Sequence, residues 1–474
     1  MATVQATTLN GQTVSIAPEA IERFRATFRG VILEQGDPGY DEARKIWNGM
    51  HDRYPALIAR CSGTADIAAA VSFARDEGIR LSVRGGGHNV AGTAVIDDGL
   101  VIDNSLMRGV YVDPVRRTAR AQPGARWGDL DREAQQFGLA TTGGEVSTTG
   151  IAGFTLGGGM GMLQRKYGLA CDNLISVQVV TAAGEIITAS ESEHPDLFWA
   201  IRGGGGNFGV ISSFEFQLHP FEPEAFALTV FYPFEDGVNL LRNWREFCET
   251  APDEVTTQVL IWSMPPLPEI PEEMHFAPVL TFVGLYAGSV ADGEKALQPL
   301  RELGESLIDM SGPAPYVQVQ SDFDPFFPDG NLYYWKSIFA DDLSDAVIEA
   351  SLRQASEART GESALIIRQL GGAISRVPED ATAFGNRQAK YNISYDSMWQ
   401  DPAVSETNIA YVRRSWDEMN ELTSGGVYLN FAGFAEDVDS LARAGHQRNY
   451  ERLQRVKRHY DPTNLFRSNI NIQP

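Results

Sequence analysis

The run Arg84-Gly85-Gly86-Gly87-His88-Asn89 places a histidine directly after three glycines, at the end of an apolar, strand-like stretch. Glycines let the backbone bend tightly and direct several N–H groups at one point, which forms a cradle for an anion such as a pyrophosphate. His88, held at the rim of that cradle, is within reach of whatever ring the pyrophosphate carries. A glycine-rich surface turn with an incidental histidine is the alternative interpretation.

A second glycine cluster runs from Thr141 to Gly159. So many residues without side chains indicate that a flat ligand lies directly on the backbone, and the hydroxyls of Ser147 and Thr148 are candidates to bond its polar edge. A merely flexible loop is the alternative.

A third cluster, 202–209, contains the spacing G-x-G-x-x-G at Gly204, Gly206 and Gly209. In nicotinamide-binding folds this fingerprint follows a strand and opens a helix. The residues that follow it here, 210–218, are β-rich and alternate in polarity, which is typical of a strand. We therefore reject a nicotinamide site.

The first glycine run needs elements that deliver it. Residues 56–61 are typical of a strand, Thr64 is a candidate cap for a helix with an apolar face, and Gly78 stands where that helix should stop. The strand to Val83 follows. This strand–helix–strand unit brings the loop to a strand end, where ligands of α/β sheets usually bind.

The pattern of the sequence changes near residue 221, where prolines become frequent, and it changes again near residue 425. We expect an α+β protein in three segments, namely a ligand-binding domain over 1–220, a substrate-binding domain over 221–424, and a C-terminal segment over 425–474 that returns to the first. The further elements expected are strands at 100–103, 110–112, 364–370, 391–395 and 427–431, a hairpin of 175–180 with 186–189, and helices at 124–137, 342–360 and 450–460.

The 474 residues carry a formal net charge of −23, with 43% hydrophobic and 10% aromatic residues. This acidity argues against nucleic acid or an anionic membrane as a partner. Either an ordinary solvated surface or a salt-rich habitat accounts for it. The three scattered cysteines and seven histidines show neither a disulfide framework nor a metal spacing. No apolar stretch reaches 18 residues and no signal peptide is visible, so we expect a cytoplasmic protein without a metal.

Taken together, the glycine clusters and the C-terminus resemble one family, the berberine-bridge-enzyme branch of FAD-linked oxidases with the vanillyl-alcohol-oxidase (PCMH-type) fold, and are similar to its bacterial hydroxynicotine-oxidase-like members. The motifs Gly168–Leu174, Leu197–Gly203, Tyr428–Phe431 and Asn449–Arg467 carry the resemblance beside the first glycine run. It implies a PCMH-type FAD-binding domain and a substrate domain built on an antiparallel sheet. The positions expected to contact FAD are Arg84, Gly85, Gly86, Gly87, His88, Asn89, Gly144, Val146, Ser147, Thr148, Thr149, Gly150, Gly153, Gly157, Gly209, Ile211 and Asn430.

The resemblance also implies a covalent bond from His88 to the flavin 8α carbon. Many relatives add a second bond from a cysteine, but the corresponding position here is Val146, so we expect single attachment. Three residues further on, oxidases of the family carry a small residue or valine, whereas poor oxygen users carry leucine or isoleucine. Thr149 has nearly the shape of valine, and by analogy oxygen reaches the reduced flavin.

A substrate proton must also be removed. Tyr428 and Asn430, two residues apart on an expected strand, point to the same face, and Tyr428 is the candidate base if its pKa is lowered. A packed strand tyrosine is the alternative. On a second strand, Ser394 stands where some relatives carry a glutamate or glutamine, which puts a carboxylate-driven mechanism in doubt. Gln369 is a candidate substrate contact or an ordinary sheet residue.

The function expected from the resemblance is an FAD-dependent oxidase that takes hydride from a small hydroxylated or amine substrate and produces hydrogen peroxide. A dehydrogenase that passes electrons to a quinone is the first alternative, and a decayed flavin-binding protein is the second. The sequence leaves the substrate and the oligomeric state open. Aromatic residues at 326, 327 and 333–335 line an apolar pocket or fill a core.

Overall fold

The structure, a computed structural model, describes residues 3–358 and 362–474. Its first sheet has the strand order β3-β4-β6-β5, in which β4 (Leu57–Arg60), β6 (Leu100–Asp103) and β5 (Leu81–Arg84) are parallel and β3 (Val31–Leu33) is antiparallel. Helix α3 (Thr64–Asp76) connects β4 to β5, as the sequence predicts. Strand β5 ends at Arg84, so the first glycine run leaves the sheet at a strand end.

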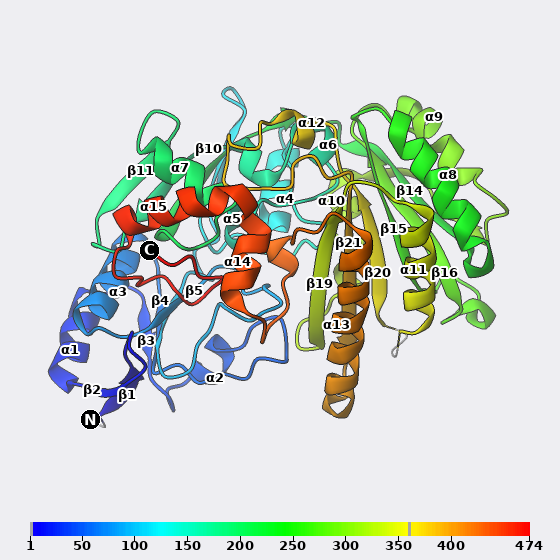
Figure 1. The fold of residues 1–474 in the computed structure, drawn as a ribbon. Helices are drawn as coiled ribbons and strands as arrows, with labels where there is room; N and C mark the ends of the chain where they lie inside the picture. Colours follow the sequence, from blue (N-terminus) through cyan, green and yellow to red (C-terminus); the bar gives the residue numbers. More distant parts are fainter. Residues whose placement is uncertain (1–2, 359–361) are drawn as a thin grey trace.

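The cap of α3 differs from the prediction. Gly63 is the N-cap residue, and Thr64 is already helical, with its hydroxyl donating to Gln178. The carboxylate of Asp66 holds the turn before the helix, because it accepts hydrogen bonds from the backbone N–H and the hydroxyl of Ser62 at 2.8 and 2.7 Å. Two further small elements, the hairpin β1 (Val4–Thr7) with β2 (Thr13–Ile16) and the helix α1 (Pro18–Thr27), lie at the N-terminal end in Figure 1.

A second sheet, with the order β11-β10-β12-β8-β7, occupies the rest of the first region. The predicted hairpin is β10 (Leu174–Val180) with β11 (Ile186–Ser190). The third glycine cluster follows helix α7 (Pro195–Ile201) and precedes strand β12 (Val210–Gln217), which confirms the rejection of a nicotinamide fingerprint. The remaining elements of this region are α2 (Tyr40–Ala43), β7 (Val110–Asp113), β8 (Thr118–Ala121), α4 (Trp127–Gln135), β9 (Leu139–Ala140), α5 (Ile151–Leu156), α6 (Gln164–Tyr167) and β13 (His219–Pro220).

The third sheet draws all its strands from the middle of the chain, and neighbouring strands in it are antiparallel. Long helices cover its outer face, visible at the right of Figure 1. Its strands are β14 (Glu224–Pro233), β15 (Val255–Ser263), β16 (Pro278–Tyr286), β17 (Ile308–Asp309), β18 (Gly312–Pro315), β19 (Leu332–Ala340), β20 (Ala364–Gln369) and β21 (Tyr391–Trp399). The helices of this part are α8 (Gly237–Thr250), α9 (Val290–Arg301), α10 (Tyr316–Val319), α11 (Asp345–Ser356), α12 (Ala373–Arg376) and α13 (Ser405–Leu422).

Helix α11 is the predicted helix of 342–360, shortened because Ser344 caps its N-terminus by accepting from the N–H of Val347. The predicted end at Thr360 lies outside the described residues. The predicted helix at 124–137 is likewise shorter, as α4, because Arg126 is its extended N-cap residue.

The C-terminal segment returns to the first region. Helices α14 (Val438–His446) and α15 (Tyr450–Tyr460) follow one another across it, and Leu453 packs into the core beneath the five-stranded sheet. The predicted strand at 427–431 is wrong. Only the Gly426 carbonyl pairs with β19, through Phe339 N–H at 3.1 Å, after which the N–H of Phe431 bonds the Tyr428 carbonyl and turns the chain into a 3-10 helix, Leu429–Phe431.

Among the described residues, no helix combines the length and apolar character needed to cross a membrane. The same part of the chain contains no group of three or more metal-ligating side chains.

Candidate active site

A cavity of about 310 Å³ lies between the glycine clusters of the first region and one face of the third sheet. The C-terminal segment closes it from a third side, through Asn430, His446, Phe466 and neighbouring residues. Of the residues predicted to bind FAD, most line this cavity: Gly85, Gly86, Gly87, His88, Asn89, Gly144, Val146, Thr149, Gly150, Gly153, Gly157, Gly209, Ile211 and Asn430.

The glycines allow backbones to meet and leave room beside the cavity. A Cβ atom on Gly86 would stand 2.5 Å from the Cα of Gly150, so the two loops touch through their main chains. At Gly153, which lines the cavity, a Cβ would meet no atom within 4 Å. This open side is suited to a flat ligand that lies against the main chain, as the sequence predicts.

His88 is held as a neutral imidazole at the cavity wall. Its ring stacks on Trp47, with ring centroids 4.3 Å apart, and its Nε2 lies 3.3 Å from the hydroxyl of Thr148. Burial lowers the pKa of His88 to about 3, and the positive charge of Arg126 acts in the same direction. A neutral imidazole keeps a lone pair, which is what a bond to carbon requires.

Two polar side chains that the sequence reasoning missed also face this cavity. Asn104 is buried, and neither its amide oxygen nor its amide nitrogen has a hydrogen-bond partner in the described part of the chain. Among the described residues, the Asn469 oxygen has no partner either, although the Nδ2 of this residue donates to the Gly206 carbonyl at 3.0 Å. Because buried polar groups are normally satisfied, these atoms fit a polar ligand in the cavity. No glycine spacing could have indicated them.

Three of the predicted FAD contacts lie outside the cavity lining. The Arg84 guanidinium donates to the Ala43 carbonyl, behind the loop. The hydroxyl and the N–H of Ser147 both donate to Asp324, at 2.6 and 2.7 Å. Thr148 faces His88 instead. The hydroxyl of Ser147 is thus engaged by Asp324, and that of Thr148 lies beside His88.

The wall opposite the glycines carries a polar patch from adjacent strands. Asp396 on β21 pairs with Trp335 on β19, and Gln258 on β15 pairs with Arg368 on β20. Paired residues of antiparallel strands point to the same face, and all four side chains line the cavity. Glu145, from the second glycine cluster, accepts from Gln258 Nε2 at 2.9 Å and completes the patch.

Asp396 is the carboxylate that the sequence reasoning did not find on this strand. Burial raises the pKa of Asp396, although Arg368 opposes that shift with its Nη2 atom 3.7 Å away. One carboxylate oxygen has no hydrogen-bond partner among the described residues. The sequence could have indicated this position, because side chains alternate along a strand and residue 396 therefore lies on the same face as residue 394.

Ser394 and Gln369 do not line the cavity. Ser394 is covered by Arg368, whose Nη1 donates to its hydroxyl at 2.7 Å. Gln369 lies on the other face of the sheet, because it is the neighbour of the cavity-facing Arg368. There its Oε1 accepts from Thr257 at 2.8 Å and its Nε2 donates to the Cys248 carbonyl on α8. The structure thus puts Gln369 in the sheet–helix core, away from any substrate in the cavity.

Tyr428 is buried and does not line the cavity, whereas Asn430 does. Although the strand that should have aligned them is absent, the two side chains meet, because Asn430 Nδ2 donates to the Tyr428 hydroxyl at 2.8 Å. That oxygen also accepts from the N–H groups of Gly159 and Met160 at 3.2 Å. Burial outweighs these three donors and raises the pKa of Tyr428 to about 12, the opposite of what a base needs.

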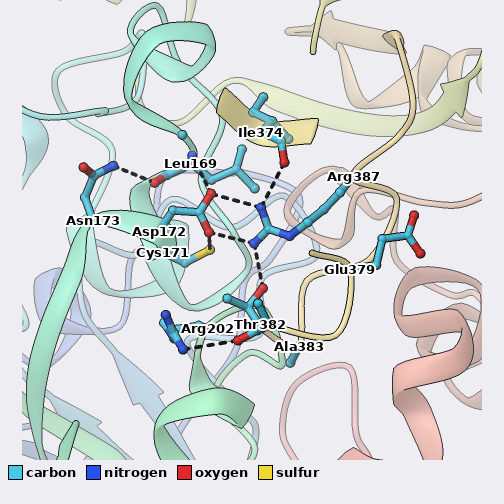
Figure 2. A network of polar contacts seen from close by, with 12 residues as sticks. Leu169, Cys171, Asp172, Asn173, Arg202, Ile374, Glu379, Thr382, Ala383 and Arg387 are labelled. Carbon is cyan, nitrogen blue, oxygen red and sulfur yellow. Dashed lines mark hydrogen bonds and ion pairs between the residues drawn. The ribbon is translucent and has the colours of Figure 1, made fainter. Parts of the chain in front are cut away.

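Figure 2 shows a buried ion pair between Asp172 and Arg387. Its neighbours Cys171 and Ile374 belong to the same core cluster as Tyr428. Arg387 donates to both oxygens of Asp172, at 2.6 and 3.0 Å, and also to the Thr382 hydroxyl. Asp172 belongs to the Gly168–Leu174 motif, and Arg387 belongs to the segment between β20 and β21. The pair therefore fastens this motif to the third sheet.

Comparison with known proteins agrees with this geometry. The family "FAD binding domain" matches residues 55–190, and the family "Berberine and berberine like" matches residues 427–473. The uncharacterised FAD-linked oxidoreductase YgaK of Bacillus subtilis is 32% identical, with 94% of this chain and 97% of that protein covered. The (R)-6-hydroxynicotine oxidase of Paenarthrobacter nicotinovorans is 31% identical, with the same coverage.

Solved structures show the same fold. The 6-hydroxy-D-nicotine oxidase from Arthrobacter nicotinovorans superimposes with a TM-score of 0.84 at 30% identity, covering 94% of this chain and 98% of that one. A chitooligosaccharide oxidase superimposes with a TM-score of 0.83 at 26% identity, covering 96% and 99%. The fold and site define an FAD-dependent oxidoreductase with a PCMH-type FAD-binding domain. Within that class, the chain belongs to the berberine-bridge-enzyme-like family of FAD-linked oxidases.

Proposed function

We propose that the protein is an oxidase with FAD bound covalently through His88 alone, that it takes hydride from a small hydroxylated or amine substrate, and that oxygen reoxidises the flavin and yields hydrogen peroxide. The relatives named for their substrates act on hydroxynicotine, xylooligosaccharide and glucooligosaccharide, which supports both substrate types. The observation that carries the proposal is a single cavity with the neutral His88 on its glycine side and a carboxylate, Asp396, on the facing sheet.

Different residues of the chain bind the cofactor and remove the substrate proton. The glycine clusters present the main chain to the cofactor, and His88 supplies the nucleophilic nitrogen for attachment, while Val146 offers no thiol for a second bond. When bound, FAD supplies the acceptor for a hydride. We assign the removal of the substrate's O–H or N–H proton to Asp396, because it lines the cavity and one of its oxygens is free to accept.

Arg368 positions Asp396 for this proton transfer. Its guanidinium lies beside Asp396, is tied to Ser394, and stands over the Phe431 ring at 4.9 Å. It favours the ionised form of Asp396, so that more of this carboxyl is deprotonated and available to accept a proton. Phe323, Phe327 and Trp335 line the cavity beside this pair and form an apolar wall for the rest of a ring-bearing substrate.

Acid precipitation of the purified protein tests the cofactor assignment. We expect the yellow chromophore to remain in the pellet of the wild type and to be released from His88→Ala. Release from both proteins would refute the covalent bond, and a protein without flavin would refute the function.

An anaerobic screen of alcohols, sugars and cyclic amines for flavin bleaching then identifies the substrate. Bleaching followed by rapid reoxidation in air, with peroxide formed, supports the oxidase. Reoxidation only by a quinone indicates the dehydrogenase, and no bleaching with any compound indicates a decayed flavoprotein.

A further inference from the structure

A short segment of the substrate-binding region, Phe323–Phe327, contacts the loop 144–150, which lines the cavity, and also Trp47, which stacks on His88. Asp324 in this segment accepts two hydrogen bonds from Ser147, one from its N–H at 2.7 Å and one from its hydroxyl at 2.6 Å. Hydrogen bonds to a charged acceptor are about twice as strong as neutral ones. Asp324 does not line the cavity itself.

The loop that Asp324 holds runs along the cavity. Gly144, Val146, Thr149 and Gly150 all line it, so a displacement of this loop changes the wall against which the flavin lies. Inside the first region, two carbonyls hold the loop. The Ser147 carbonyl accepts from the N–H of Gly128, and the Thr149 carbonyl accepts from the N–H of Trp127. From the opposite side, Asp324 bonds Ser147, while Gln258 bonds Glu145 and Gln320 bonds the Gly144 carbonyl at the start of the loop.

The other end of the same segment supports His88. The carbonyl of Phe327 accepts from the indole N–H of Trp47 at 2.9 Å, and the Trp47 ring stacks on the imidazole of His88. Between these two links, the rings of Phe323 and Phe327 line the cavity. One segment of the substrate-binding region thus supports both parts of the flavin-binding wall.

We propose that Asp324 is a flavin-positioning residue, which holds the loop 144–150 against the cofactor through Ser147 without touching the cofactor. This inference depends on the proposed function, because it requires FAD in the cavity.

The test measures flavin affinity in protein with the covalent bond removed. In a His88→Ala background, the binding of FAD becomes an equilibrium that titration calorimetry or fluorescence quenching measures. We expect Asp324→Asn to raise the Kd for FAD about tenfold or more, which corresponds to the loss of one charge-assisted hydrogen bond. Asp329→Asn, which removes an exposed carboxylate five residues away, is the matched control and leaves the Kd unchanged.

A change at Ser147 tests whether Asp324 affects FAD binding through its contact with that residue. Ser147→Ala raises the Kd as well. Adding Asp324→Asn to it raises the Kd by less than the single change does, because the bond between the Ser147 hydroxyl and the Asp324 carboxylate is already absent and only the bond from the N–H of residue 147 is left to weaken. Circular dichroism of the flavin-free proteins checks that each variant folds. With His88 intact, the fraction of chains that carry acid-stable flavin falls in Asp324→Asn and not in Asp329→Asn.

A Kd within twofold of the parent and an unchanged fraction of acid-stable flavin would overturn the positioning role. Fully additive effects of the two changes would also contradict it. A wild-type protein that binds no flavin would instead refute the proposed function, which is a different outcome.

Discussion

Asp396 and Trp335 stand directly opposite each other on β21 and β19, so that the carboxylate and the indole face the cavity side by side. Tyr428, the base expected from the sequence, lies behind Asn430 and outside the cavity lining. Under the proposed function, Asp396 on the sheet accepts the substrate proton, and Tyr428 acts by positioning Asn430.

Replacing each residue in turn should therefore show which of the two removes the substrate proton. We expect Asp396→Asn to lower the rate of anaerobic flavin bleaching by about 10²- to 10⁴-fold, the usual contribution of a general base, without reducing flavin content. Tyr428→Phe should cost about tenfold at most, because its hydroxyl only bonds Asn430 and two backbone N–H groups. Stopped-flow absorbance of the flavin measures both.

The pH profile gives the control. Because burial raises the pKa of Asp396, its carboxyl is protonated at low pH and cannot accept a proton, so kcat/KM should rise with pH until it ionises. That limb should be absent from Asp396→Asn. A larger loss in Tyr428→Phe than in Asp396→Asn would return the role of base to Tyr428.

Thr149 lines the cavity on the glycine side and is the residue expected to admit oxygen. Thr149→Leu should slow aerobic reoxidation of the reduced flavin by about tenfold, equivalent to a barrier about 1.4 kcal/mol higher, because the larger side chain takes up more of the cavity on the glycine side. Thr149→Val, which keeps the shape, is the matched control. Equal reoxidation rates in both variants would show that this position does not control oxygen access.

Asp131 on α4 is buried without a cationic partner in the described part of the chain, and it accepts only from Gln320 Nε2 at 3.3 Å. Burial raises the pKa of Asp131 to about 7. Since the folded protein then binds this proton more tightly than the unfolded chain, its contribution to stability is complete at low pH and is lost as pH rises towards about 7.

The melting temperature measured from pH 5 to pH 8 tests this. The wild type should lose about 3 kcal/mol of stability through Asp131 over that range, and Asp131→Asn should remove this part of the pH dependence. An identical pH dependence in the two proteins would contradict the assignment.

The ion pair of Figure 2 is expected to matter for stability because it is buried. Arg387→Leu leaves Asp172 buried without its cation and should cost about 3–5 kcal/mol in the free energy of unfolding, measured by chemical denaturation. Arg376→Leu is the control, since Arg376 pairs with Asp253 at the surface and such pairs contribute about 1 kcal/mol or less. Similar losses of unfolding free energy in both variants would show that the buried pair contributes no more to stability than the surface pair.

The sequence by itself determined the family, the three glycine clusters and most of the FAD-facing wall. These features are local. A glycine at Gly86 or Gly153 has its effect through its own missing side chain, and the alternation after Gly209 identifies β12 within a few residues. The absence of a thiol at Val146 is equally a property of one position.

Only the tertiary structure decided which side chains meet across the cavity. Whether Asp396, Ser394 or Gln369 faces the ligand depends on the pairing of β15, β20, β21 and β19, and a shift of one residue in a strand reverses the face of every side chain. The segment at Tyr428 coils instead of forming the expected strand, because the following N–H groups bond within the chain. The contact of Asp324 with Ser147 joins residues 177 positions apart, and no local pattern encodes it.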